Sequence, residues 1–133
     1  MNATASRAIR VLTVDDQPVF RLVAREVIAA TAGFEPMAEA GSGQEAIALV
    51  EALRPDLVLM DVRMPGMDGI EATRRMTDAA VAPVVVLISL EDPDDLAAVA
   101  GDCGAVTTVR KQDFCPDMLR RLWAAYRRDE ATT

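Results

Sequence analysis

Apolar and polar residues follow one another in blocks that predict alternating strands and helices. Runs rich in Val, Ile and Leu are typical of buried strands, whereas apolar residues that recur every three or four positions indicate helices. We expect strands at 9–14, 34–40, 56–60, 83–89 and 104–109. Helices are expected from Pro18 toward Gly33, from Ser42 toward Pro55, at 70–77, through Leu96 to Ala100, and from Pro116 to about Tyr126.

Several residues mark where these helices begin and end. Pro18 and Pro116 are suited to a first helical turn, and Gly33 to a helix end. Ser42 followed by Glu45 predicts a capping box, in which each residue binds a free backbone N–H at the helix start. The predicted apolar stripe of the first helix comprises Val19, Leu22, Val23, Val27 and Ile28.

Strands separated by helices predict a parallel sheet with right-handed crossovers. The strands at 56–60 and 83–89 are almost wholly apolar, which indicates a sheet covered by helices on both faces. We therefore expect a three-layer α/β sandwich in a single domain at 9–128. Residues 1–8 and 129–133 are expected to be flexible tails.

Composition narrows the possible functions. The 133 residues carry a net charge of −7, which argues against binding of nucleic acid or of an anionic membrane through a general positive field. The sequence contains no His, so His-based catalysis is excluded, and Cys103 and Cys115 lack metal-ligand spacing. No secretory signal or membrane-spanning run is apparent, and we expect a cytoplasmic protein.

Polar residues stand where the predicted strands end. Asp15 and Asp16 follow the first strand and Asp61 the third, while Ser89 and Lys111 end the fourth and fifth. Carboxyl ends of parallel strands gather functional groups at one edge of a sheet. Three carboxylates brought together there favour Mg²⁺, and a carboxylate can accept a phosphoryl group. We predict a Mg²⁺-assisted phosphoryl site in which Asp61 is the acceptor.

These residues resemble those of a known family, the receiver domain of bacterial two-component response regulators. The matching segments are Val14-Asp15-Asp16, Leu59 through Gly69, Ile88-Ser89 and Lys111, and the resemblance extends over residues 9 to 127. It implies a flavodoxin-like (βα)5 fold with strand order 2-1-3-4-5. It also implies that Asp61 is phosphorylated, that Ser89 and Lys111 bind the phosphoryl group, and that Asp15, Asp16, Asp61 and the backbone carbonyl of Arg63 bind Mg²⁺.

The resemblance also implies partners and a mode of signalling. The phosphoryl donor would be a sensor histidine kinase, a phosphotransfer protein or a small acyl phosphate. The switched surface would comprise the fourth helix, the fifth strand and the fifth helix, in a signalling domain rather than an enzyme. Lys111-Gln112-Asp113 resembles the subfamily that carries a C-terminal helix-turn-helix, which is lacking here. Either a stand-alone regulator that acts through a protein partner or a receiver excised from a longer chain fits, and a homodimer is left open.

The sequence departs from the family pattern at the switch. Thr108 stands where receivers usually carry an aromatic residue that reports phosphorylation. Leu90 is larger than the usual residue after Ser89, and we expect it to narrow access to Asp61 or to favour one switch state. Arg63 and Glu91 flank the site with opposite charge, and we hypothesise that they interact across its mouth and shield the acyl phosphate from water.

Two other functions compete with this interpretation. An aspartate-nucleophile phosphatase would share the sheet and Mg²⁺, but it requires an acid two residues after the nucleophile, where this chain has Arg63. An interaction domain that works without phosphorylation is the other alternative, which Thr108 and Leu90 keep open. Trp123 and Tyr126 are expected to pack in the core or to present an apolar partner face.

Overall fold

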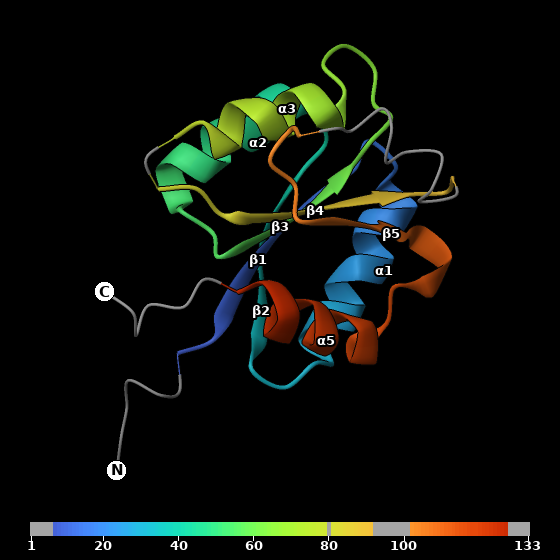
Figure 1. The fold of residues 1–133 in the computed structure, drawn as a ribbon. Coiled ribbons are helices and arrows are strands. Elements are labelled where there is room, and N and C mark those ends of the chain that lie inside the picture. Colours follow the sequence, from blue (N-terminus) through green and yellow to red (C-terminus); the bar gives the residue numbers. More distant parts are fainter. Residues whose placement is uncertain (1–6, 80, 92–101, 128–133) are drawn as a thin grey trace.

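The computed structural model describes residues 7–79, 81–91 and 102–127. Their five strands form one parallel sheet in the order β2-β1-β3-β4-β5, which confirms the predicted topology. The strands are β1 (Ile9–Val14), β2 (Phe34–Ala40), β3 (Leu57–Asp61), β4 (Val84–Ser89) and β5 (Thr107–Arg110). Helices α2 (Gly43–Leu53) and α3 (Gly69–Thr77) cover one face, and α1 (Pro18–Ala29) and α5 (Pro116–Tyr126) cover the other (Figure 1).

The core consists of two apolar layers, one on each face of the sheet. Successive residues of a strand point to opposite faces, so a strand that is apolar throughout contributes to both layers. In β3, Val58 and Met60 pack under α2 and α3, whereas Leu57 and Leu59 pack against α1 and α5. All five residues of β3 are buried, as a central parallel strand requires.

Helix starts follow the predicted local chemistry. Pro18 opens α1, and Ser42 caps α2 by accepting a hydrogen bond from the Glu45 backbone N–H at 3.2 Å. The Glu45 carboxylate reaches back to the N–H of Gly41, at 2.9 Å, and not to that of Ser42. The capping box is thus displaced by one residue on its return side, and two N–H groups at the start of α2 are still satisfied.

Three of the five residues in the predicted apolar stripe of α1 are exposed to solvent. Ile28 is buried and Val27 is half-buried, but Val19 is 73% exposed, Leu22 48% and Val23 45%. The residues that face the sheet instead are Phe20, Ala24, Val27 and Ile28. The helix carries two apolar stripes at helical spacing, and only the sheet decides which of them is covered.

Some element bounds also differ from those predicted. Strand β3 lies one residue later than expected, and β5 begins at Thr107 because Gly104, with φ of +110°, turns the chain before it. Helix α1 ends at Ala29, while Gly33, with φ of +90°, forms the turn into β2. The helix expected through Leu96 to Ala100 lies outside the described residues.

The last helix, α5, buries Leu119 and Leu122, and Trp123 packs partly against the same apolar layer. Tyr126 is 39% exposed. Of the two expectations for this residue, a place in the core is therefore wrong, and an apolar partner face stays a prediction. Among the described residues, no helix has both the length and the apolar character needed to cross a membrane.

Candidate functional site

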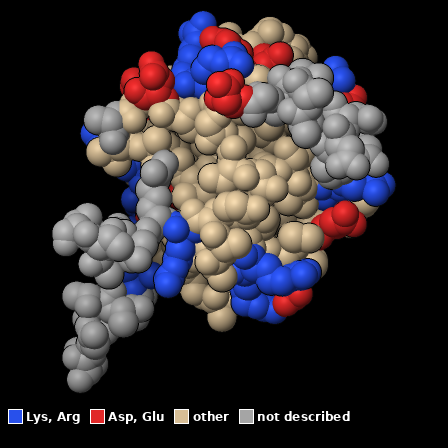
Figure 2. Space-filling model, in the orientation of Figure 1, with Lys and Arg blue, Asp and Glu red and all other residues tan. Residues whose placement is uncertain are grey.

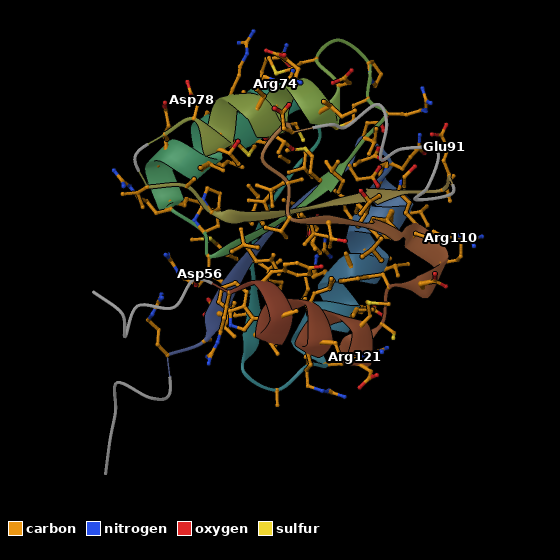
Figure 3. All side chains as sticks on the ribbon, in the orientation of Figure 1. Asp56, Arg74, Asp78, Glu91, Arg110 and Arg121 are labelled. Atoms are coloured by element: carbon orange, nitrogen blue, oxygen red, sulfur yellow. The ribbon has the colours of Figure 1, made fainter. Side chains whose placement is uncertain are left out.

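The carboxyl ends of the central strands bring the predicted site residues together. Asp61 ends β3 and Ser89 ends β4, while Asp15 follows β1 and Lys111 follows β5. Figure 3 shows Glu91 and Arg110 at this end of the molecule, with Asp56 at the opposite end, where β3 begins. Chain segments that are far apart in sequence thus supply one site, as expected for the switch in strand order between β1 and β3.

Three carboxylates form the centre of the site. Asp15, Asp16 and Asp61 each offer an oxygen within 4.8 Å of the others. Asp15 is fully buried and Asp61 is 5% exposed. The pKa of the Asp61 carboxyl is raised to about 6, mainly by burial and then by the negative charge of Asp15, while Lys111 opposes this rise. An oxygen-only set of this kind suits a hard divalent cation such as Mg²⁺, and the residues therefore fit the ion that the sequence predicts.

Lys111 supplies the positive charge of the site. Its ammonium lies 2.6 Å from Oδ2 of Asp15 and 3.5 Å from Oδ1 of Asp61. The same nitrogen lies 4.9 Å from the centre of the Phe20 ring, which in turn packs against Phe114. A cation over an aromatic face is attracted to it, so α1 helps to direct the only lysine of the sequence toward the two acids.

Asp15 is held through each of its polar groups. Its N–H donates to the Ala40 carbonyl at 3.0 Å, and its carbonyl accepts from Nη1 of Arg21 at 2.6 Å. In its carboxylate, Oδ1 accepts from the Gln17 N–H at 2.8 Å and Oδ2 faces Lys111. A buried carboxylate is stable only when it is paired and hydrogen-bonded in this way.

A cavity of about 280 Å³ opens in front of Asp61. The residues that line it are Asp16, Gln17, Asp61, Arg63, Ser89, Leu90, Glu91 and Lys111. Ser89 is buried, and its hydroxyl accepts a hydrogen bond from the Glu91 N–H at 3.0 Å. Leu90 is 73% exposed and stands at the rim. The cavity therefore gives a small anionic group access to Asp61.

Arg63 and Glu91 meet across the edge of this cavity. Nε of Arg63 donates to Oε2 of Glu91 at 2.6 Å. The hydrogen bond to Glu91 and the charge of Glu91 raise the pKa of the Arg63 guanidinium, which therefore stays charged. The contact expected from their opposite charges is present, whereas its effect on an acyl phosphate is a matter for experiment.

The turn after Asp61 returns the chain close against Asp61 itself. The Gly69 N–H donates to the Val62 carbonyl at 2.8 Å, and Asp68 caps α3 by accepting from the Glu71 N–H at 2.8 Å. A Cβ atom at Gly69 would lie 2.0 Å from the carbonyl oxygen of Asp61. Only a residue without a side chain fits there, so Gly69 allows α3 to start directly against the end of β3.

A family model described as the response regulator receiver domain matches residues 11–122. The chain belongs to this family. The matched segment contains all five strands except the start of β1, and the receiver's acid cluster lies within it. The protein is therefore the receiver domain of a two-component response regulator, which indicates a role in signalling.

Relatives of this receiver have different overall functions. It is 38% identical over 118 residues to the transcriptional regulatory protein PdtaR of Mycobacterium tuberculosis, covering 89% of this chain and 57% of PdtaR. It is also 38% identical over 104 residues to a protein-glutamate methylesterase/protein-glutamine glutaminase of Myxococcus xanthus, covering 77% of this chain and 30% of that protein. The receiver thus spans little more than half of the first relative and a third of the second.

Solved receiver structures have the same fold. The receiver domain of the response regulator NarL from Mycobacterium tuberculosis superposes with a TM-score of 0.82 at 28% identity, covering 90% of this chain and 96% of that one. CheY in a CheX-CheY-BeF3-Mg complex from Borrelia burgdorferi gives a TM-score of 0.79 at 26% identity, covering 96% of both chains.

The receiver site contains most of the residues that the sequence singled out, and others that it did not. Thr108 is half-buried on β5, paired with Leu87, and is not among the cavity-lining residues. Sequence reasoning missed Phe20 and Arg21 of α1, which contact Lys111 and Asp15. The sequence could have indicated them through their position, because the first turn of a helix that begins shortly after Asp15 and Asp16 must lie close to the site.

Figure 2 shows the charge on one face of the receiver. Described Lys and Arg side chains are interspersed with Asp and Glu around a broad uncharged centre. Among the described residues of this face, neither sign of charge is confined to one side.

Proposed function

We propose that this receiver accepts a phosphoryl group on Asp61 from a phosphohistidine of a sensor kinase or phosphotransfer protein, or from a small acyl phosphate. The observation that carries the proposal is the Asp61 carboxylate, buried beside Asp15 and Asp16, facing Lys111 and opening to a cavity. A carboxylate in that position has an approach path for phosphorus and a cationic partner for the transferred oxygens.

The reaction balances without a further reactant. A carboxylate oxygen of Asp61 forms a bond to phosphorus as the bond from phosphorus to the donor's imidazole nitrogen breaks, and the imidazole leaves with the electron pair. In the step that ends the phosphorylated state, water attacks the phosphorus, the bond from phosphorus to the Asp61 oxygen breaks, and inorganic phosphate and the free carboxylate are released. Both steps place extra negative charge on the phosphoryl oxygens, and catalysis consists largely of positioning and charge stabilisation.

Each nearby residue has a proposed role in that stabilisation. Asp15, Asp16, Asp61 and the backbone carbonyl of Arg63 would hold Mg²⁺, which supplies positive charge to the phosphoryl oxygens when bound. Lys111 would move its ammonium from Asp15 toward the phosphoryl group. The movement would be short, because the ammonium already lies 3.5 Å from Asp61. The Ser89 hydroxyl would donate a hydrogen bond to a phosphoryl oxygen.

The exposed apolar ridge of α1 is the surface on which we propose that the phosphodonor protein docks. Val19, Leu22 and Val23 lie on one side of the helix and are left uncovered by the sheet. The helix begins directly after Asp16 and Gln17, which line the cavity, so the ridge starts close to it. A donor must bring its phosphohistidine to that cavity. Val23→Asp should slow transfer from a histidine-phosphorylated donor protein and leave transfer from acetyl phosphate unchanged.

The output is proposed to be a change at the surface of β5 and α5, together with the expected fourth helix, that controls a protein partner or an output domain. Ser89 ends β4, and Lys111 directly follows β5. The two side chains proposed to bind the phosphoryl oxygens are thus attached to that surface. Thr108 lies on the same strand and, with Leu90 and Glu91 beside the cavity, is proposed to govern the switch.

The deciding experiment is incubation with acetyl phosphate, with and without Mg²⁺, followed by intact-protein mass spectrometry. We expect a gain of one phosphoryl group that requires Mg²⁺ and disappears in Asp61→Asn. Asp68→Asn is the matched control, because Asp68 caps α3 on the surface and lies outside the acid cluster. Absence of Mg²⁺-dependent phosphorylation in the wild type would favour an interaction domain that works without it.

A further inference from the structure

Arg21 of α1 contacts the acid cluster through the backbone of Asp15 and not through a carboxylate of the cluster. Its Nη1 donates a 2.6 Å hydrogen bond to the carbonyl oxygen of Asp15. Its Nε lies 3.5 Å from Oε1 of Glu39 on β2, and both side chains are about three-quarters buried, with 24% and 23% exposed. A planar guanidinium with several donors can serve a carbonyl and a carboxylate at once, which a lysine cannot do in the same geometry.

Glu39 is itself held in place by a second arginine. Arg25, one turn further along α1, donates from Nε to Oε2 of Glu39 at 2.5 Å and from Nη2 to Oε1 at 3.0 Å. This hydrogen bonding lowers the pKa of Glu39, which therefore stays charged beside both arginines. Both arginines contact the same carboxylate, but only Arg21 also reaches Asp15.

The bond to the Asp15 carbonyl fixes the peptide that joins Asp15 to Asp16. The other polar groups of Asp15 are bound to Ala40, Gln17 and Lys111, so Arg21 completes the set. Because the peptide group is planar, holding its oxygen sets the direction in which the chain continues into Asp16. Asp16 is only partly buried and must point its carboxylate toward the same ion as Asp15 and Asp61.

We propose that Arg21 is a positioning residue of the cation site, which orients the Asp15–Asp16 peptide and so raises the affinity of the three-carboxylate cluster for Mg²⁺. This inference rests on the proposed function, because it requires the cluster to bind the ion. It adds a residue that lies behind the ligands and touches neither the ion nor the phosphoryl group.

Charge and positioning predict opposite results when Arg21 is replaced. A guanidinium near a cation site repels the cation, so its loss should tighten Mg²⁺ binding if charge alone mattered. Loss of positioning should weaken binding, and partners that orient metal ligands typically contribute about 10- to 100-fold in affinity. We expect Arg21→Gln to bind Mg²⁺ about 10-fold more weakly than the wild type.

The test is isothermal titration calorimetry with MgCl2 on the wild type, Arg21→Gln and Arg25→Gln. Arg25→Gln is the matched control because it removes the same charge from the same helix and the same partner, Glu39, but no contact with Asp15. In this variant Glu39 still faces Arg21 and the Arg21 bond to the Asp15 carbonyl is untouched, so we expect its Mg²⁺ affinity to equal or slightly exceed that of the wild type. Thermal unfolding in EDTA should show that both variants are folded, and Arg21→Met, which keeps the apolar stem, gives the same comparison if Arg21→Gln does not fold.

The outcomes separate this inference from the proposed function. Equal affinities in Arg21→Gln and Arg25→Gln, or tighter binding in Arg21→Gln, would overturn the positioning role while leaving the cation site intact. Failure of the wild type to bind Mg²⁺ would overturn both.

Discussion

The Lys111 ammonium lies closer to Asp15, at 2.6 Å, than to Asp61, the proposed acceptor, at 3.5 Å. Asp15 is fully buried and the Lys111 side chain is 11% exposed, so this ion pair is shielded from water. Removing one partner of a buried pair leaves an uncompensated charge and typically costs about 3–5 kcal/mol. The stability of the cation-free protein therefore depends on Lys111, the same residue that is proposed to bind the phosphoryl group.

Lys111→Met is accordingly expected to lower the free energy of unfolding in EDTA by about 3 kcal/mol, since Asp15 and Asp61 lose their shared cation. The variant should regain more stability from Mg²⁺ than the wild type does, because the ion then replaces the missing charge. Urea unfolding with and without Mg²⁺ measures both effects. Arg110→Met, at the exposed preceding residue, is the control, and equal losses in the two variants would contradict a buried role for the Lys111 pair.

Asp61→Asn is expected to stabilise the cation-free protein at pH 7. The pKa of Asp61 is about 6 in the folded protein against an ordinary value of 3.8, so the folded state binds the proton more tightly than the unfolded state. Stability from this group is therefore present below about pH 4 and is lost as the pH rises through 6. The gain in Asp61→Asn should be about 1–3 kcal/mol at pH 7 and should shrink toward pH 4. Urea unfolding of both proteins in EDTA across this range tests it, and equal stability at pH 7 would refute it.

Arg63→Ala is expected to shorten the lifetime of the acyl phosphate. Arg63 and Glu91 close one edge of the cavity, and their removal gives water a wider approach to phosphorus. The Arg63 side chain is 72% exposed, and water screens an exposed ion pair, so the rate should change by no more than about fivefold. Loss of the phosphoryl group can be followed by mass spectrometry, with Arg120→Ala on α5 as an exposed ion-paired control. Slower or unchanged loss in Arg63→Ala would refute the shielding role.

Gly69→Ala is expected to disrupt both folding and phosphorylation. The added Cβ would meet the Asp61 carbonyl oxygen at 2.0 Å, so the acceptor strand or the start of α3 must move. Overpacking of this kind costs about 1–3 kcal/mol, and a displaced Asp61 should accept phosphate more slowly. Gly41→Ala is the control, because a Cβ there meets its nearest neighbour, Nη1 of Arg21, at an ordinary 3.6 Å. Thermal unfolding and acetyl phosphate labelling that give equal results for both variants would count against the close approach.

The sequence predicts the sheet and the place of the site because both depend on short-range patterns. The apolar runs at β3 and β4 could only be buried strands, and the acids that end β1 and β3 must then meet at one edge. The opposite charges of Arg63 and Glu91 were sufficient to predict their contact. The roles of these residues in phosphoryl transfer stay predictions.

Tertiary packing decided what the sequence could not. Two apolar stripes on α1 have the same spacing, and spacing alone does not tell that the sheet covers Ala24 and Ile28 while Leu22 stays exposed. The pairing of Lys111 with Asp15, and of Arg21 with the Asp15 carbonyl, depends on how α1 and β5 lie across the sheet edge. Side chains that bridge between elements leave no periodic signal in the sequence.

The receiver has a single lysine, which can therefore be labelled selectively by amine chemistry. All other basic side chains are arginines, so Lys111 is the one side-chain amine, and it stands at the acceptor. Reductive methylation with isotope-labelled formaldehyde should therefore yield one side-chain resonance in addition to that of the α-amino group. Its chemical shift would report the state of the acid cluster directly, without a mutation or a probe attached elsewhere.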